Sequence, residues 1–190
     1  MENIYVVAMP AATTTFDSVD DLVAHLRELA TLGSDEGLAF SELDHGLQTA
    51  AILESTHPDD LELQVAGLVH DLAHPWDGPG QPNHHRMGAE AVEGLLGRRV
   101  AMLIEAHVDA KRYLVATDAS YQAALSPGSI ITLDAQGGPL SPDEILMVEQ
   151  RHDWSAAVAL RRADDGAKQV GVVVADLDHW IPALREVAGR

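Results

Sequence analysis

The stretch LVHDLAHPW, residues 68–76, decides how this chain is interpreted. It places His70, Asp71 and His74 inside an otherwise apolar run of helix-forming residues. Residues four apart share one face of a helix, so His70 and His74 point the same way. Adjacent helical residues point about 100° apart, so His70 and Asp71 reach one site only from different sides. A carboxylate that bridges two metal ions fits this arrangement, whereas the alternative is an ordinary polar helix surface.

The composition is that of a globular protein. The chain has 190 residues, of which 46% are hydrophobic and 22% charged. These values predict a single domain, residues 1–190, with one sizeable core. No cysteine is present, which excludes disulfides, thiolate metal ligands and a cysteine nucleophile. A reducing cytoplasm fits such a chain.

The net charge of −18 limits the partners that we expect. Nucleic acid and anionic membranes are poor partners for so acidic a surface. No window reaches the roughly 18 consecutive apolar residues of a spanning helix, and the first residues lack the basic start of a signal peptide. A cytoplasmic monomer or homodimer fits these observations.

The pattern along the chain is helix after helix, with apolar residues at helical spacing behind capping residues. This predicts an all-α fold. The expected helices are 17–33, 41–56, 59–74, 86–96, 98–108, 120–126, 143–164 and 176–189. Residues 170–174 are the one segment where a short strand is an alternative.

Histidines and acids recur on these successive helices. The candidate metal ligands are His45, His70, Asp71, His84, His107 and Asp153. Nitrogen and oxygen ligands without sulfur suit iron, manganese, magnesium or zinc. One metal needs only four of them, so the additional histidines favour two metals bridged by Asp71. The remaining histidines, His25, His57, His85, His152 and His179, are expected at the surface.

Several segments resemble one branch of a known superfamily. These are ELDHGLQTA, LVHDLAH, HHRMGAEAV, IEAHVDAKRYLVATDASY, LSPGSIITLDAQGGP and EQRHDW, which span about residues 42–168. Together they resemble the mixed-valent di-iron oxygenases of the HD-domain superfamily. That branch includes the PhnZ-type phosphonate-cleaving oxygenases, a trimethylammonio-phosphonate oxygenase and, more distantly, myo-inositol oxygenase. The resemblance implies an all-α HD-domain helical bundle around a dinuclear metal site.

The resemblance also implies the cofactors and the role of each matching residue. One iron would be held by His45, His70, Asp71 and Asp153, and the other by Asp71, His84 and His107. The pair would be mixed-valent Fe(II)/Fe(III), with O2 as co-substrate. His74 and Lys111 would act in catalysis, and the contacts to the organophosphonate substrate would come from Lys111, Ser126, Gln136 and Arg151.

The implied reaction oxidises the hydroxyl-bearing carbon of a small 1-hydroxyphosphonate and cleaves its carbon–phosphorus bond, releasing phosphate and a carboxylic acid. The tyrosine and glutamate that the PhnZ-type enzyme carries before its first histidine are replaced here by Asp35 and Leu38. A smaller substrate, such as hydroxymethylphosphonate, is therefore one hypothesis. A metal-dependent phosphohydrolase acting on a phosphate ester is the alternative function, and a non-catalytic member of the fold is a third.

Overall fold

The computed structural model describes residues 14–32, 41–77 and 81–190. Within these ranges the chain is helical and contains no β-strand, which confirms the predicted all-α fold. The helices are α1 (Val19–Leu29), α2 (Glu42–Thr56), α3 (Leu61–Val69), the 3-10 helix η1 (His74–Trp76), α4 (His84–Leu96), α5 (Arg98–Thr117), α6 (Ala119–Ala124), α7 (Pro127–Ala135), α8 (Pro142–Glu149), α9 (Trp154–Gly166) and α10 (Leu177–Ala188). None of these described helices is long and apolar enough to cross a bilayer.

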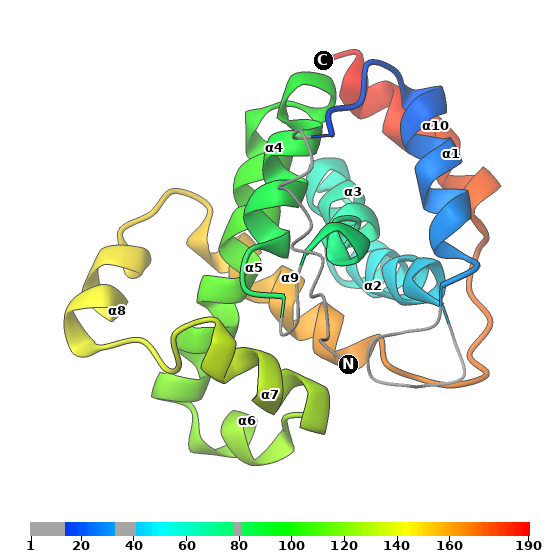
Figure 1. Ribbon diagram of the computed structural model, residues 1–190. Helices are drawn as coiled ribbons and strands as arrows, with labels where there is room; N and C mark the ends of the chain where they lie inside the picture. The colour runs from blue at the N-terminus through cyan, green and yellow to red at the C-terminus, as the bar shows by residue number, and fades with distance from the viewer. Residues whose placement is uncertain (1–13, 33–40, 78–80) are drawn as a thin grey trace, which may run out of the picture.

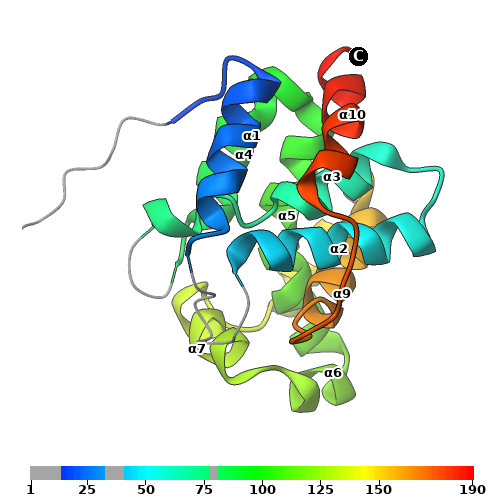
Figure 2. The same ribbon diagram turned by 90° about the vertical axis from the view of Figure 1, so that its right-hand side faces the viewer.

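The centre of the bundle is made of α2, α3, α5 and α9, which pack against one another. Helix α4 lies along α5, and α1 and α10 pack together at one end (Figures 1 and 2). Helices α6, α7 and α8 lie at the opposite end (Figure 1). The core between the central helices is formed by fully buried side chains such as Leu53, Leu63, Ile104 and Leu160.

Helix α2 begins where the sequence predicts. The Ser41 hydroxyl accepts the backbone N–H of Asp44, and the Asp44 carboxylate accepts the backbone N–H of Ser41. This reciprocal capping satisfies two backbone donors that a helix start leaves without partners. It fixes the start of α2 at Glu42, three residues before His45.

The helix expected over residues 59–74 ends early. α3 stops at Val69, and the chain continues through a tight turn into η1. Pro75 has no N–H and cannot continue the α-helical ladder. The next hydrogen bonds join residues three apart: the His74 N–H donates to the Asp71 carbonyl at 3.0 Å, and the Trp76 N–H donates to the Ala73 carbonyl at 2.9 Å.

Other segments also differ from the prediction, and α7 was not expected. The helix expected over 143–164 is interrupted, because Asp153 adopts a left-handed backbone with φ of 59° before α9 begins. α5 continues to Thr117, well beyond residue 108. Residues 172–176 have no regular structure, so the possible strand does not form.

Close approach between α2 and α3 depends on glycine. A Cβ at Gly46 would lie far inside van der Waals distance of the Leu68 backbone carbonyl oxygen. A backbone atom cannot move aside as a flexible side chain can, so Gly46 lets the two helices touch. This contact places His45, the residue before Gly46, beside His70.

We expect Gly46→Ala to force α2 and α3 apart. The overpacking should lower the free energy of unfolding by about 1–3 kcal/mol, and it should weaken metal binding because His45 moves with α2. Thermal unfolding and metal titration check both effects. The matched control is Gly94→Ala in α4, where a Cβ would meet no atom within 4 Å. That variant should be neutral or stabilised by about 0.5–1 kcal/mol, and an equal loss in both variants would contradict the packing argument.

Candidate metal centre

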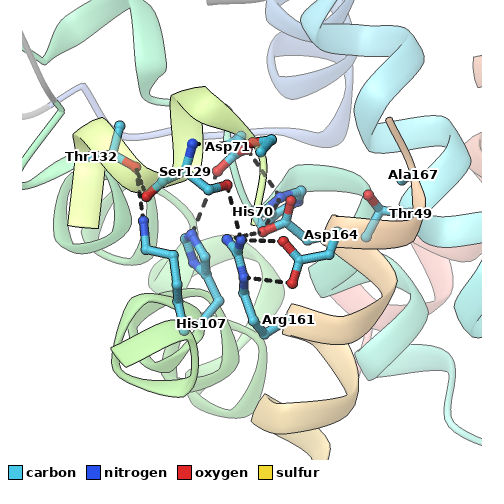
Figure 3. A network of polar contacts seen from close by, with 12 residues as sticks. Thr49, His70, Asp71, His107, Ser129, Thr132, Arg161, Asp164 and Ala167 are labelled. Carbon is cyan, nitrogen blue, oxygen red and sulfur yellow. Dashed lines mark hydrogen bonds and ion pairs between the residues drawn. The ribbon is translucent and has the colours of Figure 1, made fainter. Parts of the chain in front are cut away.

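Five helices bring imidazole rings and carboxylates to one buried place. The residues are His45 from α2, His70 and Asp71 from the end of α3, His84 from α4, His107 from α5 and Asp164 from α9. Each of these histidines and Asp164 is at most 4% exposed. Ligand atoms of His45, His70, Asp71 and Asp164 lie within 4.8 Å of one another, as do those of Asp71, His74 and His84. Figure 3 shows Asp71 and Asp164 beside His70, with His107 nearby.

Asp71 lies between two groups of ring nitrogens, and each of its oxygens faces one group. Oδ2 is 3.0 Å from Nε2 of His70 and 3.5 Å from Nε2 of His45. Oδ1 is 3.5 Å from Nε2 of His84 and 3.6 Å from Nε2 of His107. A carboxylate placed in this way can bridge two cations.

The backbone orients all four rings through their other nitrogen. The Nδ1 atoms face carbonyl oxygens as follows: His45 to Ala167 at 3.4 Å, His70 to Gly67 at 2.9 Å, His84 to Gln81 at 2.8 Å and His107 to Ile104 at 2.6 Å. A carbonyl oxygen only accepts hydrogen bonds, so Nδ1 carries the proton and donates it. In the neutral ring, Nε2 then carries a lone pair that points into the site.

These lone pairs meet other acceptors. Nε2 of His84 and Nε2 of His107 are 3.1 Å apart, and Nε2 of His70 lies 3.0 Å from a carboxylate oxygen of Asp71. In the described part of the chain, His70 Nε2 and Asp71 Oδ1 are buried and make no hydrogen bond. Acceptors so close together repel unless a proton or a metal ion lies between them. The residues therefore fit a metal, with the backbone carbonyls as the outer partners that fix each ring.

The pKa values show where the site attracts positive charge. Burial lowers the pKa of His70, but the carboxylates of Asp71 and Asp164 outweigh it and raise that pKa to about 10. Burial, with repulsion from His74, lowers the pKa of His84 to about 3. A metal must displace the proton from His70, so metal binding should release protons and weaken at low pH.

Next to these candidate ligands is a group of cationic side chains, which we call the cationic cluster: Lys111, Arg161 and Lys168. Lys111 and Arg161 are buried, and the side chain of Lys168 is 20% exposed. Arg161 donates to the Asp164 carboxylate at 2.6 Å and to the Ser129 hydroxyl at 3.3 Å (Figure 3). Lys168 Nζ is 3.4 Å from the same hydroxyl, and Lys111 Nζ donates to the Thr132 hydroxyl at 2.9 Å. Arg161 is also paired with Asp165, so two carboxylates compensate its guanidinium. Lys111 and Lys168 add further positive charge beside this paired group, which fits a site for an anion.

Comparison with known proteins identifies the family. The model of the HD-domain family matches residues 23–136, more than half of the chain. This chain is an HD-domain protein. It is 35% identical over 166 residues to the hydroxymethylphosphonate dioxygenase of Gimesia maris, an alignment that covers 80% of this chain and 82% of that protein. It is 30% identical over 155 residues to the [1-hydroxy-2-(trimethylamino)ethyl]phosphonate dioxygenase (glycine-betaine-forming) of Leisingera caerulea, with 77% and 79% covered.

In this HD-domain protein, the second carboxylate beside His45 and His70 is that of Asp164, which the sequence analysis missed. Asp164 Oδ1 lies 3.1 Å from Nε2 of His45. The predicted ligand, Asp153, lies elsewhere: its carboxylate accepts a hydrogen bond from Arg99 at 2.9 Å, and Arg99 also binds Asp60. This corrects the prediction.

The physical reason for the correction is the length of α9. Asp153 directly precedes its first residue, and Asp164 lies eleven residues later, roughly 16 Å along the axis. The signal for Asp164 was present in the sequence, because it shares the apolar stripe of Ala157 and Leu160 at helical spacing, where an acid needs a buried partner.

Only some of the predicted substrate contacts lie at the cationic cluster. Lys111 is 2% exposed and belongs to the cationic cluster. The side chain of Arg151 is 48% exposed and donates to Asp109 at 2.8 Å, so the structure does not bring it to the cluster, where the buried guanidinium is that of Arg161. Ser126 accepts the N–H of Ser129 at the start of α7. The hydroxyl that faces Arg161 is therefore that of Ser129, one helical turn further on.

Gln136 and His74 both contact groups next to the candidate metal ligands. Gln136 donates to the Gln81 carbonyl at 3.3 Å, the carbonyl that also accepts from His84. The ring of His74 lies between two carboxylates, with Nδ1 3.0 Å from Glu42 and Nε2 3.2 Å from Asp71. Burial lowers the pKa of His74, but these carboxylates raise it well above its usual value.

His85 was expected at the surface but is buried, and its ring lies 5.5 Å from that of His84. The replacements Asp35 and Leu38 lie outside the described residues.

A matched pair of variants tests the ligand assignment. We expect Asp164→Asn to lower the apparent metal affinity at least about tenfold, because the neutral amide no longer supplies charge to the cation. Asp153→Asn should retain the metal and lose at most about 1 kcal/mol of stability through its weaker bond to Arg99. Metal content after dialysis and thermal unfolding measure both effects. Loss of metal from the Asp153 variant, with retention by the Asp164 variant, would restore the original assignment.

A second prediction concerns Lys111, whose pKa is lowered from 10.5 to about 7, chiefly by burial and also by Arg161. Between these values the unfolded chain binds more protons than the folded one, so this lysine makes stability rise with pH and disfavours folding most at pH 7 and below. Lys111→Met should stabilise the metal-free protein by up to a few kcal/mol at pH 7, and the gain should shrink towards pH 10.

Thermal unfolding at both pH values measures the effect of Lys111→Met. The exposed Arg151→Met serves as the control and should show no such trend. A gain that is equal at pH 7 and pH 10 would contradict the lowered pKa.

Proposed function

We propose that this chain is a di-iron oxygenase that oxidises the hydroxyl-bearing carbon of a small 1-hydroxyphosphonate with O2. Cleavage of the carbon–phosphorus bond would release phosphate and a carboxylic acid. The observation that carries the proposal is the bridging position of Asp71 between two groups of ring nitrogens, directly beside the cationic cluster. Two relatives that are named phosphonate dioxygenases support it.

The ligands divide into two groups that share Asp71. One metal would be held by His45, His70, Asp71 and Asp164, and the other by Asp71, His84 and His107. When bound, a mixed-valent Fe(II)/Fe(III) pair would supply the redox chemistry with O2 that neither imidazole nor carboxylate can perform alone. Histidine and carboxylate ligands suit iron.

The protein's own part is to bind and orient the substrate. The phosphonate dianion would accept hydrogen bonds from Arg161, Lys111 and the Ser129 hydroxyl, with Lys168 adding charge. Binding would return the pKa of Lys111 towards its usual value, because the anion compensates the burial. His74 is held next to Asp71 and can keep or give up a proton there as the products form.

The cationic cluster also explains how so acidic a protein would bind an anion. Charges on the exposed surface are screened beyond roughly 8 Å at physiological salt. The buried cations act at hydrogen-bond distance in a medium of low polarity, where each contact is stronger. The −18 net charge therefore does not oppose the proposed substrate.

Hydroxymethylphosphonate is the first substrate to test, and formate and phosphate would be its products. The protein is reconstituted with iron under anaerobic conditions, partly oxidised and examined by low-temperature EPR with and without this phosphonate. A spin-half signal from the coupled pair, shifted by the phosphonate, is expected. Consumption of O2 with equal yields of formate and phosphate would identify the reaction. Phosphate-ester hydrolysis without O2 consumption would instead show the phosphohydrolase.

A matched pair of lysine and arginine variants tests the anion site. Lys111→Met should raise the KM for the phosphonate by about 10- to 100-fold, because one charge-assisted hydrogen bond is lost. Arg151→Met, which removes an exposed cation bound to Asp109, should leave KM within about twofold of its original value. The reverse order would place the phosphonate near Arg151. Steady-state O2 uptake across phosphonate concentrations gives the KM of each variant.

A further inference from the structure

His25 on α1 contacts the backbone of the turn that follows α3, and the proposed function does not use this contact. Its ring is half-buried, and its Nε2 donates to the Leu72 carbonyl oxygen at 2.8 Å, across 47 positions of sequence. Leu72 lies between Asp71 and His74, the two residues of this turn whose side chains meet. A helix outside the ligand groups therefore holds the backbone that carries the bridging carboxylate.

The turn leaves this carbonyl available. In a continuing α-helix the Leu72 carbonyl would accept the N–H of Trp76, four residues later. Here the Trp76 N–H donates to Ala73 instead, at 2.9 Å. Leu72 is 1% exposed, so water is a poor substitute, and a buried carbonyl without a partner is costly. The hydrogen bond from His25 meets this need and favours the tight turn over the α-helical alternative.

The tight turn decides where Asp71 points. A 3-10 helix has three residues per turn, so side chains three apart stack directly above one another. Asp71 and His74 are three apart, and Asp71 Oδ1 lies 3.2 Å from Nε2 of His74. In an α-helix the same pair would be rotated by about 60° from this stacking. Asp71 would then no longer lie midway between the two groups of ring nitrogens.

Aromatic packing holds the His25 ring in place. Its centroid lies 4.9 Å from that of Trp76, which ends η1, and 5.5 Å from that of Phe16. The Phe16 N–H donates to the Ala91 carbonyl of α4 at 3.3 Å. The ring is thus fixed between the end of the turn and a residue tied to the helix that begins with His84.

We propose that His25 is a positioning residue for the bridging carboxylate. Its Nε2–H keeps the Leu72 carbonyl bonded, maintains the tight turn and so aims Asp71 at both groups of ligands. The consequence for the metals rests on the proposed dinuclear site. The consequence for the turn does not, because it follows from backbone hydrogen bonds of the protein without metal.

Two substitutions separate the hydrogen bond from the packing. His25→Gln keeps an N–H donor close to the position of Nε2 but removes the aromatic ring. His25→Phe keeps a ring between Phe16 and Trp76 but removes the donor. His179→Gln, at an exposed ring on α10, is the control for histidine loss as such.

The first measurement is amide hydrogen exchange on the metal-free, full-length protein. His25→Phe should speed exchange at His74 and Trp76 at least about tenfold relative to the wild type, whereas His25→Gln should stay within about threefold of it. Exchange at these amides that is unchanged in His25→Phe would overturn the proposal. Equal acceleration in both variants would also overturn it, because packing alone would then explain the role of His25.

The second measurement is iron content and EPR of the reconstituted proteins. His25→Phe should bind less than the two irons per chain or give an altered mixed-valent signal, and should lower kcat with little change in KM. His25→Gln should resemble the wild type in all three. A wild type that holds no metal pair would refute the proposed function, and hydrogen exchange would still decide the role of His25. A normal iron pair and kcat in His25→Phe would overturn the positioning role.

Discussion

One carboxylate, Asp71, connects the parts of this structure that matter for function. Its two oxygens face separate groups of imidazole Nε2 atoms. In the neutral rings these atoms carry lone pairs, because the Nδ1–H on the other side of each ring donates to a backbone carbonyl. Such a set of buried acceptors is unfavourable without a cation. The close approach of α2 and α3 at Gly46 and the tight turn after α3 both serve to bring these acceptors together. The packing of the helices and the binding of a cation are therefore energetically coupled.

Arg161 joins this centre to the anion site. Its guanidinium donates to the Asp164 carboxylate and to the Ser129 hydroxyl, so one side chain contacts a proposed metal ligand and the proposed phosphonate site. A buried charge is tolerated when it is paired and fully hydrogen-bonded. Asp164 and Asp165 both pair with Arg161 before any ligand binds. Pairing within one helix keeps this arrangement fixed when substrate and metal bind.

Sequence patterns predicted the all-α fold well because amphipathic periodicity and caps act locally. Ser41 begins α2 as expected. The patterns failed where tertiary contacts override a local preference, as at the end of α3, where a helical run gives way to a tight turn. They also failed for Asp153 and Arg151, because a motif near the start of α9 resembled a site that the helix forms three turns later with Asp164 and Arg161.

The sequence by itself determined that this is a helical protein whose histidines recur on successive helices, because the spacing along single helices is defined by the chain alone. That His45, His70, Asp71, His84 and His107 belong together was implied by the resemblance to the HD-domain oxygenases. Only the tertiary structure decided which carboxylate joins them and which cations lie beside them. The reason is physical: ligand geometry depends on how α9 crosses α2 and α5, and a crossing is fixed by packing between distant segments and not by the periodicity of any one of them.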